Sequence, residues 1–148
     1  MTGTAIETRT VVVEREIPYP PEKIWRALTQ PRLIEEWLMK NDFELVADHK
    51  FNLHGDWGSV DCQVLKIQQH KTLSYSWAAH GLESVVTWTL TPTSKGTNLR
   101  MKQSGFRPDH EQFYQGAKVG WGNFFAKLEQ VLGGPTEGRW SRLKGSAS

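Results

Sequence analysis

The sequence lacks several features that would assign the protein to a class at once. It contains one cysteine, Cys62, so an intrachain disulfide is impossible, and a reducing compartment is consistent with this. No apolar run reaches the length of a membrane span. The first residues show no basic stretch followed by an apolar one, so no signal peptide is predicted. We therefore expect a cytoplasmic protein.

An excess of charge of one sign is also missing. Lysine and arginine together number 18 and aspartate and glutamate 16, which leaves a formal net charge of +2. Long-range attraction to nucleic acid or to an acidic membrane is weak at this charge. We expect neither of them to be a partner.

Motifs that carry catalysis or bind metal are not evident. The five histidines show no HExxH spacing, no second cysteine could share a metal with Cys62, and no glycine-rich phosphate loop follows a strand. We expect no metal and no cofactor. Cys62 has no evident histidine partner in the sequence and is interpreted as a small core residue rather than a nucleophile.

Tryptophan, in contrast, is abundant. The chain has seven tryptophans in 148 residues. Because the indole ring is bulky and its N–H seeks a partner, this number indicates a wide, partly polar interior or a lined pocket. Ordinary core packing could also absorb most of them.

The hydrophobic periodicity predicts an α+β protein. Alternation predicts a strand over residues 8–17, and prolines at 20–21 and 31 open two short helices. Short alternating segments between residues 41 and 104 predict an antiparallel meander with one apolar face. Helical spacing predicts a long amphipathic helix over residues 109–132. Only this helix is large enough to cover a curved sheet, and a straight helix over a concave sheet tends to leave a space.

The long helix contains an internal contradiction. Asp109 and Gln112 have the spacing of a capping box and predict its N-terminal end. The Gly-Gly-Pro sequence at 133–135 predicts its C-terminal end. Yet Gly116, Gly120 and Gly122 lie inside it, and each costs about 1 kcal/mol relative to alanine. Two explanations stay open: close packing of the helix on the sheet, or room beside the helix for a ligand.

Arg15 is the odd residue of the first strand. It shares a face with Val11, Val13 and Ile17, an otherwise apolar row. Near the strand end it could reach the surface and pair with an acid. Alternatively, it could point into a cavity and meet an acidic group of a ligand.

Several short runs resemble those of a known family. They are VEREIP at 13–18, PEKIWRALT at 21–29, VDCQVL at 60–65, LSYSW at 73–77, VTWTLTP at 86–92 and the pair Gly120-Trp121. In this order and spacing they resemble the activator of heat-shock-protein-90 ATPase homologue family, within the START-like or SRPBCC superfamily. The resemblance covers about residues 8–132.

This resemblance implies a helix-grip fold, similar to that of the birch pollen allergen, with a seven-stranded antiparallel sheet around a long C-terminal helix. Residues 8–132 would then form a single START-like domain, and residues 133–148 a flexible C-terminal tail. The resemblance also makes a chaperone a candidate partner, although the additional chaperone-binding domain of the eukaryotic activators is not expected here. Some cyclases and dehydratases on this fold work with a few scattered polar groups of the cavity.

We predict a ligand cavity between the sheet and the long helix. Arg15 and Gln103 would be its few polar groups. The predicted lining, with these two included, is Arg15, Trp37, Tyr75, Trp77, Trp88, Met101, Gln103, Phe113, Ala117 and Trp121. The alternative is that these aromatic residues fill the space themselves and leave no usable cavity.

The leading functional hypothesis is a binding module. A mostly apolar cleft with a few convergent polar groups is the usual small-molecule site, so we expect an apolar or amphipathic ligand, lipid-like or polycyclic aromatic. One alternative is an enzyme of the cyclase or dehydratase type, in which Arg15, Tyr75 and Gln103 would polarise a carbonyl. Another is a chaperone-interacting protein that acts through its surface. The sequence makes no prediction of the oligomeric state.

Overall fold

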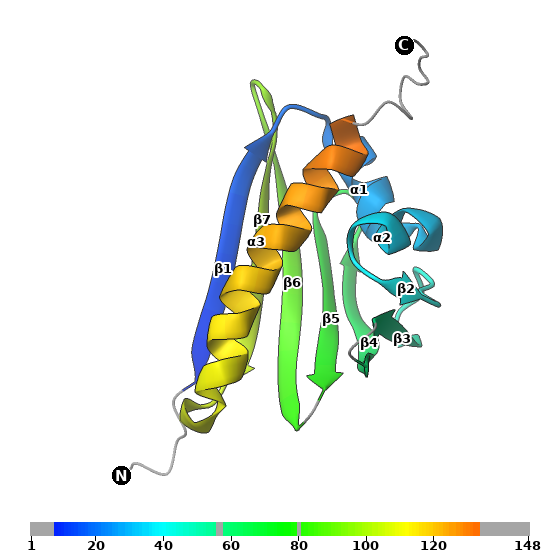
Figure 1. Ribbon diagram of the computed structural model, residues 1–148. Helices are drawn as coiled ribbons and strands as arrows, with labels where there is room; N and C mark the ends of the chain where they lie inside the picture. Colours follow the sequence, from blue (N-terminus) through cyan, green and yellow to red (C-terminus); the bar gives the residue numbers. More distant parts are fainter. Residues whose placement is uncertain (1–7, 56–57, 80, 134–148) are drawn as a thin grey trace.

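The computed structural model describes residues 8–55, 58–79 and 81–133 (Figure 1). These residues form one seven-stranded antiparallel sheet with a long helix across one face. The elements in chain order are β1 (Arg9–Ile17), α1 (Pro21–Thr29), α2 (Pro31–Trp37), β2 (Lys40–Asn41), β3 (Lys50–Gly55), β4 (Gly58–Gln68), β5 (Thr72–Ala79), β6 (Leu82–Thr93), β7 (Gly96–Phe106) and α3 (Glu111–Gly133). The predicted α+β helix-grip fold is thus confirmed.

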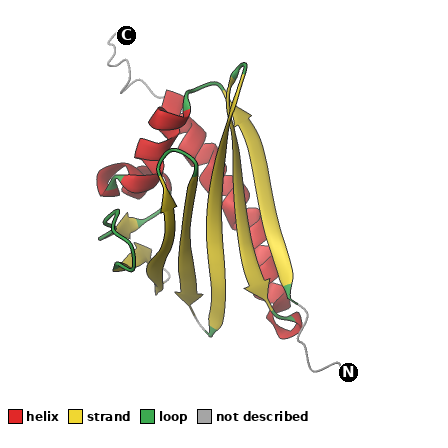
Figure 2. Ribbon diagram, turned by 180° about the vertical axis from the view of Figure 1, so that it is seen from behind, coloured by secondary structure: helices red, strands yellow, loops and turns green. Residues whose placement is uncertain are grey.

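The sheet has the order β1-β7-β6-β5-β4-β3-β2. Strands β2 to β7 follow one another as an antiparallel meander, and β1 joins the far edge by pairing with β7. Figure 2 shows the face of the sheet opposite α3, which the helices leave uncovered. A shift of register between Val64 and Lys66 interrupts the pairing of β4 with β5, as a β-bulge does.

The boundaries differ from the sequence prediction in two places. The predicted meander includes residues 43–45, but these lie outside any strand, between β2 (Lys40–Asn41) and β3 (Lys50–Gly55). The long helix begins at Glu111, and Asp109 lies before it in a 3-10 turn, Pro108–His110. The Asp109 carboxylate accepts a hydrogen bond from Arg107 (3.3 Å), so the predicted capping box does not form. The predicted tail lies outside the described residues, apart from Gly133.

The buried residues of α3 are confined to its C-terminal half. The residues of α3 that are buried are Trp121, Phe125, Leu128 and Leu132, whereas none of the ten residues from Glu111 to Gly120 is buried. The C-terminal half of α3 therefore packs into the core. The N-terminal half covers the sheet without filling the space below it.

Among the described residues, no helix combines the length and the hydropathy of a membrane span.

Candidate functional site

A cavity of about 400 Å³ lies between the N-terminal half of α3 and the sheet. Its walls come from the adjoining ends of β5 and β6, from the last part of β7 and from α3. The described residues that line it are Trp77, Ala79, Leu82, Gln103, Phe106, Gln112, Phe113, Gly116, Ala117, Gly120, Trp121 and Phe124. Most of this lining is apolar.

Two of the helical glycines form part of the cavity wall. A Cβ atom added at Gly116 or at Gly120 would meet no heavy atom within 4 Å, apart from the neighbouring helix backbone. Close packing against the sheet is therefore the wrong explanation for these glycines. Their missing side chains leave room on the inner side of the helix. Gly122 also has open space around it, but it does not line the cavity.

Aromatic rings make the sides of the cavity. Trp77 of β5 and Trp121 of α3 contact each other with ring centroids 5.3 Å apart, and Phe124 meets Trp121 edge-on at 5.4 Å. Phe113, with 37% of its surface exposed, lies where the cavity reaches solvent. These rings offer flat apolar surfaces to a ligand.

One buried polar side chain faces this apolar surrounding. Gln103, which is 2% exposed, accepts a hydrogen bond from the indole N–H of Trp121 (2.6 Å) through Oε1. Its Nε2 donates to the hydroxyl of Ser84 (2.9 Å), and Ser84 donates to the backbone carbonyl of Trp77 (2.9 Å). This chain of hydrogen bonds ties β5, β6 and β7 to α3 and holds the amide in one orientation.

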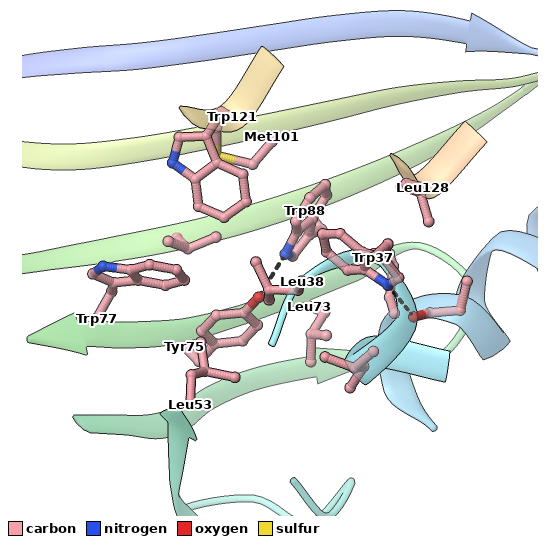
Figure 3. Packing of buried hydrophobic residues seen from close by; sticks show 14 of the residues in the cluster. Trp37, Leu38, Leu53, Leu73, Tyr75, Trp77, Trp88, Met101, Trp121 and Leu128 are labelled. Atoms are coloured by element: carbon pink, nitrogen blue, oxygen red, sulfur yellow. Dashed lines mark hydrogen bonds between the residues drawn. The ribbon is translucent and has the colours of Figure 1, made fainter. Parts of the chain in front are cut away.

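The other end of the space between sheet and helix is filled (Figure 3). Trp88, with no exposed surface, meets Trp37 edge-on at 5.6 Å and Trp121 at 5.7 Å. The indole N–H of Trp88 donates to the Tyr75 hydroxyl (2.9 Å), and the indole of Trp37 donates to the backbone carbonyl of Ala27 (2.8 Å). Both of these indole N–H groups are thus satisfied within the core.

The structure separates the ten predicted site residues into three groups. Trp77, Gln103, Phe113, Ala117 and Trp121 line the cavity. Trp37, Tyr75, Trp88 and Met101 belong to the filled core beside it. Arg15 lies apart from both: its side chain is 49% exposed, and its Nε is 3.9 Å from the Glu129 carboxylate on α3. The pairing of Arg15 with a surface acid is therefore the alternative that the structure shows.

Seven lining residues were missing from the sequence prediction. Gly116, Gly120 and Phe124 could have been found from the helical spacing, which places them on the same side as Phe113 and Ala117. Ala79 continues the alternation of Trp77. Leu82, Phe106 and Gln112 come from the ends of elements, where the sequence pattern gives no direction.

The cavity contains no ionisable side chain among the described residues that line it. The two strongly shifted groups of the core lie elsewhere. Burial raises the pKa of the Tyr75 hydroxyl, and burial beside Asp61 and Asp42 raises the pKa of the Cys62 thiol to about 12. Neither residue lines the cavity. In the described part of the chain, no three His, Cys, Asp or Glu side chains gather as a metal site would require.

A second hollow, of about 480 Å³, has a different character. It is lined by Lys50, Asn52, Asp61, Gln63 and Ser76 together with Phe51, Cys62 and Ala78, from strands β3, β4 and β5. Its polar lining makes it a weaker candidate for an apolar ligand.

Comparisons with known proteins agree with this architecture. The family model described as Activator of Hsp90 ATPase homolog 1-like protein matches residues 18–133. Among solved structures, protein MLL2253 from Mesorhizobium loti is 61% identical, with 84% of this chain and 97% of that chain covered and a TM-score of 0.83.

Two further solved structures share the fold at lower identity. CalU16 from Micromonospora echinospora is 24% identical, with 93% of this chain and 83% of that chain covered and a TM-score of 0.75. The Aha1 dimer from Colwellia psychrerythraea is 20% identical, with 84% of this chain and 96% of that chain covered and a TM-score of 0.76. The comparison with curated proteins gave no match.

Proposed function

The chain belongs to the family of Activator of Hsp90 ATPase homolog 1-like proteins, and from that premise we propose that it binds a small apolar or amphipathic molecule, lipid-like or polycyclic aromatic. The site is the cavity between the sheet and the N-terminal half of α3. Its volume of about 400 Å³ falls within the range of small-molecule sites. Its lining has the expected composition, since aromatic and aliphatic surfaces surround one buried amide.

The open space beside Gly116 and Gly120 carries this proposal. Each glycine costs the helix about 1 kcal/mol relative to alanine. No neighbouring atom requires the small residue at either position, since an added Cβ would meet nothing within 4 Å. A bound molecule that occupies this space would explain the two glycines, which the packing of the chain does not explain.

Binding is better supported than transformation of the ligand. A cyclase or dehydratase needs a group that moves a proton, and the described lining residues contain no ionisable side chain. Tyr75 and Arg15, which the enzyme hypothesis requires, both lie outside the cavity lining.

The test is a titration with N-phenyl-1-naphthylamine, an uncharged dye that becomes fluorescent in apolar surroundings. A Gly120→Leu side chain would enter the cavity, whereas a Gly122→Leu side chain would not, so the second variant is the matched control on the same helix. We expect Gly120→Leu to weaken binding at least about tenfold, which corresponds to about 1.4 kcal/mol. Gly122→Leu should bind as the wild type does. Equal affinity in all three proteins would place the dye elsewhere and contradict the proposed site.

A further inference from the structure

The polar groups of the cavity narrow the class of ligand further. Resting on the proposed function, we infer that the site selects an uncharged molecule that presents a hydrogen-bond acceptor, such as the carbonyl oxygen of an aromatic ketone or a quinone. Two independent observations lead to this inference: the charge of the lining and the direction of its hydrogen bonds.

The lining residues that the structure describes offer no partner for a charged group. The described lining residues include no Asp, Glu, Lys, Arg or His. A charge moved from water into apolar surroundings without a partner loses much more hydration free energy than an uncharged group does. Arg15, which the sequence offered as a cation for the cavity, is paired with Glu129 and does not line it. A carboxylate or an ammonium ion is therefore disfavoured inside the cavity.

The hydrogen bonds within the protein show which atoms of the Gln103 amide already have a partner. An indole N–H can only donate, so the atom of Gln103 that faces Trp121 at 2.6 Å must be the carbonyl oxygen Oε1. The amide nitrogen then faces Ser84, whose own hydroxyl proton goes to the carbonyl of Trp77. Trp121, Gln103 and Ser84 thus donate in one direction along the chain. Turning the amide over would set two donors against each other at Trp121.

This arrangement leaves donors unused at the cavity. The amide nitrogen of Gln103 has two hydrogens, and the bond to Ser84 uses one of them. The second hydrogen and the indole N–H of Trp77 have no partner among the described residues. Gln103 is 2% exposed, so water reaches it poorly. A buried donor without a partner is unfavourable, and an acceptor on the ligand removes that cost.

Gln112, the second amide side chain of the lining, is not expected to select for an acceptor on the ligand. Gln112 is exposed at the start of α3, where water can satisfy both its donors and its acceptor. It therefore imposes no preference on the ligand, and it provides a matched control for Gln103.

Three naphthalenes of similar size test the inference by calorimetric titration. 2-Acetylnaphthalene carries a carbonyl, 2-ethylnaphthalene lacks an acceptor, and 2-naphthoate is charged. The wild type should bind the ketone at least about tenfold more tightly than the ethyl compound, because the ethyl compound leaves the amide donor unpaired. The carboxylate should bind most weakly. This comparison uses the wild type alone, so it does not depend on the folding of any variant.

Two variants then assign the preference to one residue. In Gln103→Leu the preference for the ketone over the ethyl compound should become smaller than in the wild type, because the amide donor is lost while the indole N–H of Trp77 remains. In Gln112→Leu the preference for the ketone should persist. Equal affinity of the wild type for ketone and ethyl compound, or tightest binding of the carboxylate, would overturn the inference. If none of the three binds while N-phenyl-1-naphthylamine does, the inference fails and the proposed function stands. If the dye fails to bind as well, both fail.

Discussion

At the scale of single residues, the position of a tryptophan along the sheet determines whether it fills the core or lines the cavity. Trp88 and Trp121 contact each other at 5.7 Å, and both are buried. Trp88 is enclosed by Trp37, Phe125 and the hydroxyl of Tyr75, so it fills the core. Trp121 has the same kind of contact on one side and the cavity on the other. A substitution at Trp88 would therefore test stability rather than binding.

Cys62 gives a prediction that depends on pH. Burial, with smaller effects of Asp61 and Asp42, raises the pKa of its thiol to about 12, from an ordinary value near 9.0. The folded state therefore holds the proton more tightly than the unfolded state does. The resulting stabilisation is complete below the pKa of the unfolded thiol and is lost as the pH rises through about 12.

Reaction with a thiol reagent measures this directly, because the thiolate is the reacting form. In the folded protein, the rate of modification of Cys62 should keep rising about tenfold per pH unit between pH 7 and pH 10. In urea-unfolded protein the rate should level off above about pH 9. A folded-state profile that levels off at the same pH as the unfolded one would contradict the buried, proton-retaining environment.

At the scale of elements, the same substitution should have opposite effects in α3 and at a sheet turn. Gly122→Ala adds a Cβ that meets nothing within 4 Å, so the helix should gain up to about 1 kcal/mol in free energy of unfolding. At Gly96, the first residue of β7, φ is +151° and an added Cβ would lie 2.2 Å from the carbonyl oxygen of Ile17. Gly96→Ala should therefore lose more than about 1 kcal/mol. Urea unfolding of both variants checks this, and a stabilised Gly96→Ala would refute the turn geometry.

Most of the elements could be predicted because they have a strong local signal, which the two-residue strand β2 lacks. Alternation marks the strands, prolines open α1 and α2, and the spacing of apolar residues marks α3. The rotation of α3 about its axis could not be predicted, because two adjacent apolar stripes compete and only packing on the sheet chooses Trp121 and Phe125 over Phe124. The helix begins two residues later than predicted for a similar reason, since a 3-10 turn competes with a capping box at Asp109.

The candidate site was predictable only in part, for a related physical reason. Alternation marks the inward-facing positions of the strands, so Trp77 and Gln103 could be assigned to the inner side, and helical spacing does the same for Trp121. Alternation does not say how far a helix stands from the sheet at each point. Trp37, Tyr75, Trp88 and Met101 were therefore assigned to the cavity although they fill its closed end. Arg15 lies in an exposed part of β1 and its side chain reaches the surface. The alternation of apolar residues within one strand does not predict this exposure.

At the scale of the whole molecule, the fold divides one interior into two parts. The C-terminal half of α3 closes the core with Phe125, Leu128 and Leu132, and the N-terminal half, which contains no buried residue up to Gly120, roofs the cavity. One helix thus supplies stability at one end and a binding site at the other. Substitutions at the two ends should accordingly separate stability from binding.

The most direct test of this account follows the indole N–H signals of the tryptophans by NMR during titration with 2-acetylnaphthalene. We expect the signals of Trp77 and Trp121, which line the cavity, to shift in a saturable manner, and the signal of Trp37, in the filled core, to stay unchanged. In Gly120→Leu the shifts of Trp77 and Trp121 should disappear, and in Gly122→Leu they should remain. If the probe leaves Trp77 and Trp121 unmoved, or moves them equally with leucine at position 120, the cavity beneath α3 is not the binding site.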